Sequence, residues 1–174
     1  WGSFEGIELA GKTLGIVGTG AVGAELCHMA SGFGMNCLAW NRSGVDPTLP
    51  CREVPLAQLF READAISLHI AYAEETHEMI GAPLLQSVRP GAILVNTARG
   101  GVVDDAALGT ALTDGPLGHA ALDVFTEEPL DAGSPFCRLE NVTLAAHAAW
   151  KTPDAADRLM RRGLEILRDD IQAL

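Results

Sequence analysis

The chain has 174 residues, 48% of them hydrophobic, which suffices for one domain with a buried core but not comfortably for two. Its formal net charge of −11 argues against a nucleic-acid partner, because phosphates would be repelled and no basic cluster is longer than Arg161-Arg162. We expect a cytoplasmic protein away from membranes, since no stretch has the roughly 18 to 20 apolar residues of a span and the start resembles no signal peptide.

The four cysteines indicate a reducing compartment. Cys27, Cys37, Cys51 and Cys137 show no C-x-x-C spacing, and two of them fall inside apolar elements. This pattern favours reduced core thiols over disulfides or a zinc site, and we expect no bound metal. The chain begins with Trp1 instead of Met, which suggests a piece of a longer protein.

Short apolar runs alternate with segments of helical periodicity along the chain. The runs predict strands over residues 13–18, 36–40, 65–70, 92–97, 118–124 and 142–147. The intervening segments predict helices over residues 21–34, 55–63, 81–88 and 104–114. Strands that are apolar throughout and separated by helices are typical of a parallel sheet covered on both faces. We therefore predict an α/β fold with a doubly wound parallel sheet.

The last segment, TPDAADRLMRRGLEILRDDIQAL, predicts an amphipathic helix. Thr152 suits the N-cap, Pro153 the first helical position, and Asp154 the positive end of the helix dipole. Apolar positions recur every three and four residues, at Ala156, Leu159, Met160, Gly163, Leu164, Leu167 and Ile171. We expect this stripe to pack against the core.

The stretch VGTGAVG has the spacing of a phosphate-binding loop between a strand and a helix. Gly18 permits the tight turn, Gly20 lets the backbone approach a pyrophosphate, and Gly23 lets the helix pack closely on the strand. The loop residues Thr19, Ala21 and Val22 complete the candidate cofactor site. A purely structural turn, or another nucleoside ligand such as adenosylmethionine, remains the alternative.

The end of the second predicted strand bears on the choice of cofactor. An NAD site usually has Asp or Glu about 20 residues after the glycine loop, whereas this strand ends CLAWNRSG, with no acid before Asp46. Asn41, Arg42 and Ser43 offer hydrogen-bond donors and one cation, which suit a 2′-phosphate. We therefore favour NADP over NAD. In the alternative interpretation, Arg42 is a solvated surface residue.

Three ionisable side chains follow strands that should end at one edge of the sheet. Arg99 follows AILVNT, Glu128 follows GHAALDV, and His147 closes VTLAAH. Each alone has a structural explanation, but ligands of parallel sheets bind outside the carboxyl ends of the strands. Together they offer a cation for a carboxylate, a proton donor, and a carboxylate able to keep that donor protonated.

Four motifs in this order resemble the D-isomer-specific 2-hydroxyacid dehydrogenases: VGTGAVG, NTARGGVVDDAAL, ALDVFTEEPL and AAHAAW. The opening WGSFEGIELAGKTLGIVG also looks like the start of the family's nucleotide domain. The resemblance runs over practically the whole chain. It implies that residues 1–174 form a Rossmann-type dinucleotide-binding domain, and that the family's second, substrate-binding domain is absent from this chain.

The resemblance also implies roles for individual residues. Arg99 would bind the substrate's carboxylate and keto oxygen, His147 would protonate the keto oxygen, and Glu128 would pair with His147 and keep it protonated. Asp123 matches a position that contacts the nicotinamide carboxamide. Thr97 and Ala98, which lead into Arg99, would adjoin the cofactor.

The ending HAAW is similar to that of glyoxylate, hydroxypyruvate and glycerate-type members, so small 2-keto acids are the expected substrates and 2-hydroxy acids the products. The family resemblance further implies a homodimer formed through this domain. Departures from the family pattern occur at Ala71, Ala73 and Ala146, where the family often has Pro near by. Two alternatives stay open: a non-catalytic dinucleotide-binding or nucleotide-sensing module, and a methyltransferase-like nucleoside binder.

Overall fold

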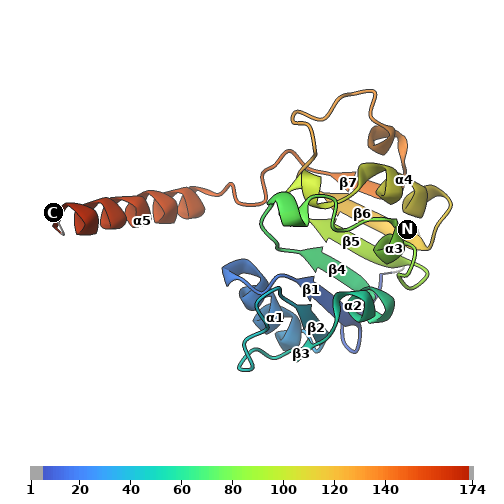
Figure 1. Cartoon of the computed structure of the whole chain (residues 1–174), viewed down its shortest axis with the longest axis horizontal. Helices are drawn as coiled ribbons and strands as arrows, with labels where there is room; N and C mark the ends of the chain where they lie inside the picture. Colours follow the sequence, from blue (N-terminus) through green and yellow to red (C-terminus); the bar gives the residue numbers. More distant parts are fainter. Residues whose placement is uncertain (1–5, 173–174) are drawn as a thin grey trace.

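The computed structural model describes residues 6–172, and a sheet of seven parallel strands lies at its centre (Figure 1). The strands are β1 (Thr13–Val17), β2 (Asn36–Trp40), β3 (Arg52–Glu53), β4 (Ala65–Leu68), β5 (Ala92–Asn96), β6 (Leu117–Leu122) and β7 (Val142–Leu144). Their order in the sheet is β3-β2-β1-β4-β5-β6-β7. Strands β1 to β3 are added toward one edge of the sheet and β4 to β7 toward the other, so the order reverses between β1 and β4, at the topological switch point of a doubly wound fold. The predicted fold class is confirmed.

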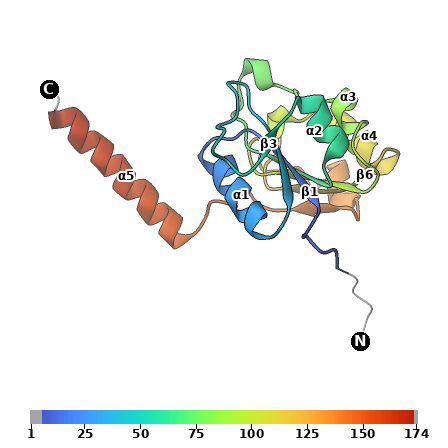
Figure 2. The same cartoon turned by 90° about the horizontal axis from the view of Figure 1, so that it is seen from below.

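Helices cover both faces of this sheet. The covering helices are α1 (Ala21–Gly32), α2 (Leu56–Glu62), α3 (Ala82–Leu85) and α4 (Asp105–Thr113). The chain also forms α5 (Pro153–Gln172), which does not cover the sheet, and the 3₁₀ turns η1 (Glu74–Thr76), η2 (Gly100–Val102) and η3 (Pro135–Arg138). Figure 2 shows α1 on one side of the sheet and α2, α3 and α4 on the other. Helices lie against the sheet because they form the right-handed crossovers that join its parallel strands.

The alternation of side chains along β1 divides the core into two clusters. Leu14 and Ile16 belong to the cluster beneath α1, which also contains Cys27 and Cys37. Val17 belongs to the larger cluster shared with α2, α3 and α4. Because successive strand residues point to opposite faces, both faces of β1 are buried, as its uninterrupted apolar sequence predicts.

Most predicted elements occur within one to three residues of their expected bounds. The chief omission is β3, which has two exposed residues and lies at the edge of the sheet. It has no apolar run because neither of its faces is buried, so periodicity could not reveal it. The last predicted strand also ends early, at Leu144, and therefore His147 lies in the segment beyond it. The first residues of the opening motif, 1–5, lie outside the described residues.

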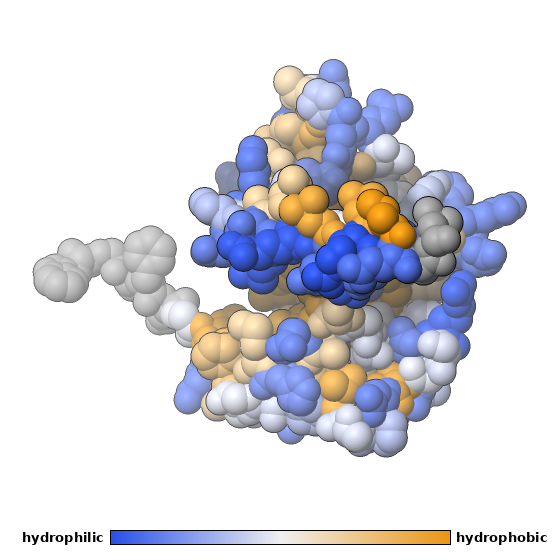
Figure 3. Space-filling model, turned by 90° about the vertical axis from the view of Figure 1, so that its left-hand side faces the viewer, coloured by the Kyte–Doolittle hydropathy of each residue, from blue (hydrophilic) through white to orange (hydrophobic). Residues whose placement is uncertain are grey.

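The prediction that the final helix packs its apolar stripe on the core is wrong. α5 forms as expected, but it projects from the body of the domain and buries none of its residues (Figure 1). Leu159, Met160, Leu164 and Ile171 are all more than 60% exposed. Figure 3, which views the molecule from the side where α5 projects, shows orange apolar and blue charged side chains separated on it.

The helical conformation of α5 is supported locally by charge pairs. Arg161 pairs with Asp157 one turn earlier at 2.7 Å, and Arg162 pairs with Glu165 at 3.0 Å. Such exposed pairs stabilise a helix only by tenths of a kilocalorie per mole, about 0.2–0.5 kcal/mol each. Among the described helices, none combines the length and the apolar character that crossing a membrane requires.

Candidate active site

The residues of the predicted site gather at the carboxyl edge of the sheet. All seven strands run parallel, so the segments that follow them emerge on the same side. The residues placed there are Gly18 after β1, Asn41 after β2, His69 after β4, Thr97 after β5, Asp123 after β6 and His147 beyond β7. The structure thus brings together residues that are up to 129 positions apart in sequence, from Gly18 to His147.

The glycine loop has the shape of an anion cradle. Gly18 has φ +95°, and a Cβ there would also lie 2.7 Å from the carbonyl oxygen of His69. A Cβ on Gly20 would meet nothing within 4 Å, so this side of the loop is open to a ligand. α1 begins directly after Gly20 without a side-chain cap. The first N–H groups of α1 are therefore free to bind a phosphate.

Asn41 organises the segment that follows β2. Its side-chain oxygen accepts a hydrogen bond from the Thr19 amide at 3.3 Å, which links this segment to the glycine loop. Its side-chain nitrogen donates to Ser43 Oγ and to the Gly44 carbonyl, each at 3.0 Å. Arg42 is exposed, and these residues share a cavity of about 360 Å³ with the glycine loop. The segment can therefore meet the ribose end of a dinucleotide.

Asn96 shapes the turn that presents Arg99. This buried side chain accepts a hydrogen bond from the Ala98 amide at 3.0 Å and donates one to the Arg99 carbonyl at 2.9 Å. Gly100 then packs so closely on Phe125 and Thr126 that a Cβ would overlap their backbone atoms. Arg99 itself is exposed, with Nη1 donating to the Ala98 carbonyl at 2.6 Å. Its guanidinium is thus held by the backbone with donors left for an anion.

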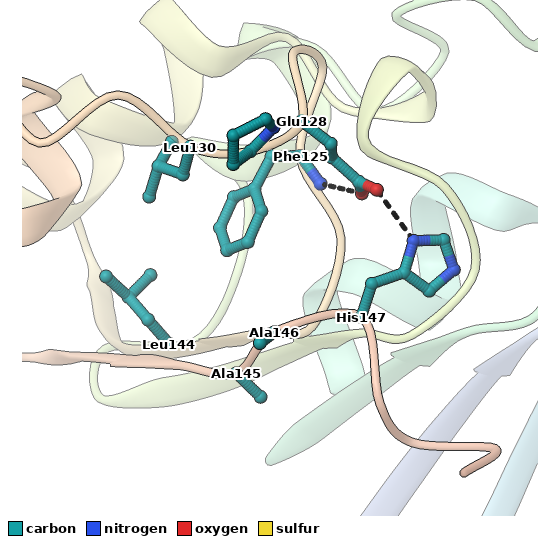
Figure 4. A pocket seen from close by; sticks show the side chains of 8 residues that line it. Phe125, Glu128, Leu130, Leu144, Ala145, Ala146 and His147 are labelled. Carbon is teal, nitrogen blue, oxygen red and sulfur yellow. Dashed lines mark hydrogen bonds and ion pairs between the residues drawn. The ribbon is translucent and has the colours of Figure 1, made fainter.

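Glu128 and His147 form a hydrogen-bonded pair, as the resemblance implies. Glu128 Oε2 lies 2.7 Å from His147 Nδ1, and Glu128 Oε1 accepts a hydrogen bond from the Phe125 amide at 3.0 Å. Figure 4 shows the two side chains facing each other beside an apolar hollow lined by Phe125 and Leu144. The carboxylate leaves Nε2 as the ring nitrogen available to a ligand.

Electrostatics at the pair favour an ionised carboxylate. The hydrogen bond from His147 holds the pKa of Glu128 below its ordinary value, with further contributions from the Phe125 amide and from the charges of His147 and Arg99. The positive charge of Arg99 thus also favours the ionised form of the carboxylate that binds His147.

The Asp123 side chain forms hydrogen bonds to the protein backbone. The carboxylate is buried, and it accepts hydrogen bonds from the amides of Ala148 at 2.8 Å and Ala149 at 2.9 Å. His147 has φ +50°, in the left-handed region that non-glycine residues rarely adopt. The His147 amide also donates to the Asp123 carbonyl at 2.8 Å. Asp123 therefore anchors the segment that carries His147.

Two residues near Arg99 escaped the motif analysis. His69 lies just after β4, with Nε2 2.9 Å from Ser67 Oγ, and burial lowers its pKa. Tyr72 lines a cavity of about 550 Å³ together with Arg99 and Val22. Their place after the strand at the topological switch point is the signal that could have identified them. Among the described residues, no group of three or more His, Cys, Asp or Glu side chains is arranged to hold a metal ion.

Comparison with known proteins decides which family this geometry belongs to. Residues 1–149 match the family described as D-isomer specific 2-hydroxyacid dehydrogenase, NAD binding domain. The chain belongs to this family.

Individual 2-hydroxyacid dehydrogenases match this chain over nearly all of its length. A glyoxylate reductase of Korarchaeum cryptofilum is 44% identical over 157 residues, which cover 88% of this chain and 47% of the relative. A hydroxypyruvate reductase of Thermotoga maritima is 36% identical over 167 residues, covering 95% of this chain and 54% of the relative. The chain therefore spans about half the length of these relatives.

A solved structure of this family shares the fold. D-lactate dehydrogenase from Aquifex aeolicus, complexed with NAD and lactic acid, is 30% identical, with a TM-score of 0.84 over 96% of this chain and 55% of that one. The chain thus carries the nicotinamide-dinucleotide-binding domain of the 2-hydroxyacid dehydrogenases.

Proposed function

We propose that the protein containing this chain reduces a small 2-keto acid, such as glyoxylate or hydroxypyruvate, to a D-2-hydroxy acid. The observation that carries the proposal is the Glu128–His147 pair, 2.7 Å apart, at the same sheet edge as Arg99 and the glycine loop. The named relatives, a glyoxylate reductase and a hydroxypyruvate reductase, support this substrate class.

In the proposed reaction, each residue acts through a group that the structure leaves accessible. Arg99 binds the carboxylate of the keto acid and polarises its keto oxygen, because a guanidinium can meet two oxygens at once. His147 donates a proton from Nε2 to that oxygen, while Glu128 holds Nδ1 and stabilises the charged ring. The nicotinamide cofactor, when bound, supplies the hydride for the keto carbon. In the reverse direction His147 acts as the base.

We propose that the glycine loop and the segment after β2 bind this cofactor. Gly18, Gly20 and Gly23 would bring the backbone of residues 18–23 against the pyrophosphate, since Gly20 offers an open side and the start of α1 has free N–H groups. Thr97 and Ala98 would adjoin the nicotinamide end. Asp123 would accept a hydrogen bond from the nicotinamide carboxamide through the carboxylate lone pairs that the amides of Ala148 and Ala149 leave free.

NADP is the preferred cofactor in this proposal. Ser43 and the exposed Arg42 lie in the cavity beside the glycine loop, and the segment 41–45 contains no acidic residue. Glu75, on the segment after β4, also lines this cavity. A phosphate gains charge-assisted hydrogen bonds from such a set.

The remaining proposals concern the whole protein. Residues 1–174 would form the nucleotide-binding domain, and a second domain would close over the substrate and complete the site. A homodimer formed through this domain is the proposed assembly, as the family resemblance implies.

The test is a turnover assay on the full-length protein. We expect NADPH-dependent reduction of glyoxylate or hydroxypyruvate, and its loss in Arg99→Ala while calorimetry still detects NADP⁺ binding. Binding of the dinucleotide without turnover in the unaltered protein would instead indicate a non-catalytic or nucleotide-sensing module. Turnover that survives unchanged in Arg99→Ala would contradict the role of that residue.

A further inference from the structure

Tyr72 lies on the wall of the cavity that contains Arg99, although no motif of the family pointed to it. The cavity is also lined by Val22 of the glycine loop and by Thr97 and Ala98. The side chain is 53% exposed, so a ligand held by Arg99 could reach it. An aromatic residue with a hydroxyl group at this place offers both a surface and a hydrogen-bonding atom.

The ring of Tyr72 is held in place by the turn that follows Arg99. A Cβ on Gly101 would lie 2.7 Å from Tyr72 Cε2, so only glycine leaves room for the ring in this position. The His77 ring meets Tyr72 edge-on, with centroids 6.0 Å apart and planes at 90°. The amide of Glu78 donates to the Gly101 carbonyl at 2.9 Å, which ties the same segment to the same turn. Tyr72 therefore packs on the turn that follows Arg99.

The hydrogen bond between Tyr72 and His77 has a preferred direction. Tyr72 Oη lies 3.3 Å from His77 Nδ1, and His77 Nε2 lies 3.9 Å from the Glu78 carboxylate. In the neutral imidazole, this carboxylate favours the tautomer with the proton on Nε2 and leaves Nδ1 as an acceptor. In this tautomer the Tyr72 hydroxyl donates the hydrogen bond and His77 Nδ1 accepts it. The oxygen of Tyr72 is left with its lone pairs, so it accepts hydrogen bonds from a ligand.

An acceptor oxygen on Tyr72 distinguishes a neutral hydroxyl from a second anionic group on the substrate. A hydroxyl can donate to Tyr72, whereas a carboxylate or a sulfonate offers only acceptor atoms and leaves the Tyr72 oxygen without a donor. The carboxylate of Glu78, 3.9 Å from His77 Nε2, adds negative charge behind the pair.

We propose that Tyr72 determines specificity by accepting a hydrogen bond from a hydroxyl group on the carbon next to the keto carbon of the substrate. The same arrangement disfavours a sulfonate or carboxylate at that carbon. The inference rests on the proposed function, because it concerns the substrate bound by Arg99. It predicts a 3-hydroxy-2-keto acid as the preferred substrate.

Hydroxypyruvate and pyruvate provide the test, because they differ by the hydroxyl group alone. In the full-length protein, Tyr72→Phe keeps the ring on Gly101 and removes the acceptor. We expect the ratio of kcat/KM for hydroxypyruvate to kcat/KM for pyruvate to fall by about 3- to 10-fold, the effect of one neutral hydrogen bond. Thermal unfolding and NADPH affinity should match those of the unaltered protein, which excludes misfolding as the cause.

A second variant tests the direction of the hydrogen bond. His77→Phe keeps an aromatic ring beside Tyr72 but frees its hydroxyl to donate, so turnover of sulfopyruvate should rise relative to hydroxypyruvate. The matched control is His28→Phe, which replaces an exposed histidine of α1 that lines none of the cavities described above. If relative sulfopyruvate turnover does not rise in His77→Phe, the assigned direction of the Tyr72–His77 hydrogen bond is wrong. An equal rise in His28→Phe would contradict it as well.

The outcomes separate this inference from the proposed function. If the unaltered protein reduces 2-keto acids and Tyr72→Phe leaves the hydroxypyruvate-to-pyruvate ratio unchanged, the role of Tyr72 is wrong and the proposed function stands. If the unaltered protein reduces no 2-keto acid, the proposed function fails, and this inference fails with it.

Discussion

The carboxylate of Asp123 accepts a hydrogen bond at 2.8 Å from the amide of Ala148, the residue directly after His147. A second amide, that of Ala149, donates to its other oxygen at 2.9 Å. The two bonds hold the chain where His147 adopts φ +50°. The site thus depends on a buried acid that touches the catalytic segment through the backbone.

Asp123→Asn should destabilise the fold and displace His147. Asparagine keeps one acceptor oxygen but places an N–H₂ group against the other amide, so one charge-assisted bond is lost and a donor faces a donor. We expect the free energy of unfolding to fall by about 1.5–3 kcal/mol, measured by urea denaturation. Asp114→Asn, at the exposed end of α4, is the control and should change it far less.

His147→Asn should abolish proton transfer while leaving the cofactor site intact. General acids contribute about 10²- to 10⁴-fold to such reactions, and kcat should fall by that factor. NADPH affinity, measured by fluorescence titration, should stay near that of the unaltered protein because His147 lies outside the glycine loop. Loss of NADPH binding would show that the substitution disrupts the domain and not the chemistry. His28→Asn serves as the histidine control.

Two glycine-to-alanine substitutions should have opposite effects on stability. A Cβ on Gly100 would overlap the backbone of Phe125 and Thr126, so Gly100→Ala should cost about 1–3 kcal/mol and separate Arg99 from the Glu128 segment. Gly109 lies within α4, where a Cβ meets nothing within 4 Å. Gly109→Ala should therefore stabilise the protein by about 0.5–1 kcal/mol. Thermal unfolding of the two variants tests this expectation. Equal shifts of the melting temperature in Gly100→Ala and Gly109→Ala would contradict the packing described for Gly100.

Arg42→Gln should weaken NADP⁺ selectivity. A charged hydrogen bond contributes about 1.5–3 kcal/mol, so the ratio of NADP⁺ affinity to NAD⁺ affinity should fall by about 10- to 100-fold. Calorimetric titration with both dinucleotides measures this ratio directly. Arg138→Gln, which removes an exposed arginine on η3, should leave the ratio as it is. An unchanged ratio in Arg42→Gln would mean that Arg42 is a solvated surface residue.

The stability of the protein should depend on pH through His69. Burial lowers the pKa of His69 in the folded state below its ordinary value of 6.5. As the pH falls through the ordinary value toward the folded pKa, the unfolded chain binds more protons, and the free energy of unfolding falls. His69→Gln should lose less stability than the unaltered protein between about pH 7.5 and about pH 5.5. Parallel pH profiles of the two melting temperatures would contradict this.

The layout of the domain follows from the order of apolar runs and glycines in the amino-acid sequence. The apolar runs of β1, β2 and β4 are largely buried on both faces, so their composition reveals them without knowledge of their neighbours. The spacing of Gly18, Gly20 and Gly23 reflects a local backbone requirement, which is also visible in sequence. Strand order then places Arg99, Glu128 and His147 near one edge, because parallel strands share a carboxyl end.

The contacts between side chains of different segments, in contrast, are visible only in the folded domain. Asp123 binds the amides of Ala148 and Ala149, which lie on a distant part of the chain. Tyr72 packs on Gly101, which is also distant in sequence. Neither contact can be predicted without the distances between these segments. The position of α5 is a further case: its sequence predicts an amphipathic helix but cannot say whether a partner for its apolar stripe exists in this chain. Periodicity encodes which face is apolar, whereas burial depends on what the rest of the fold places against it.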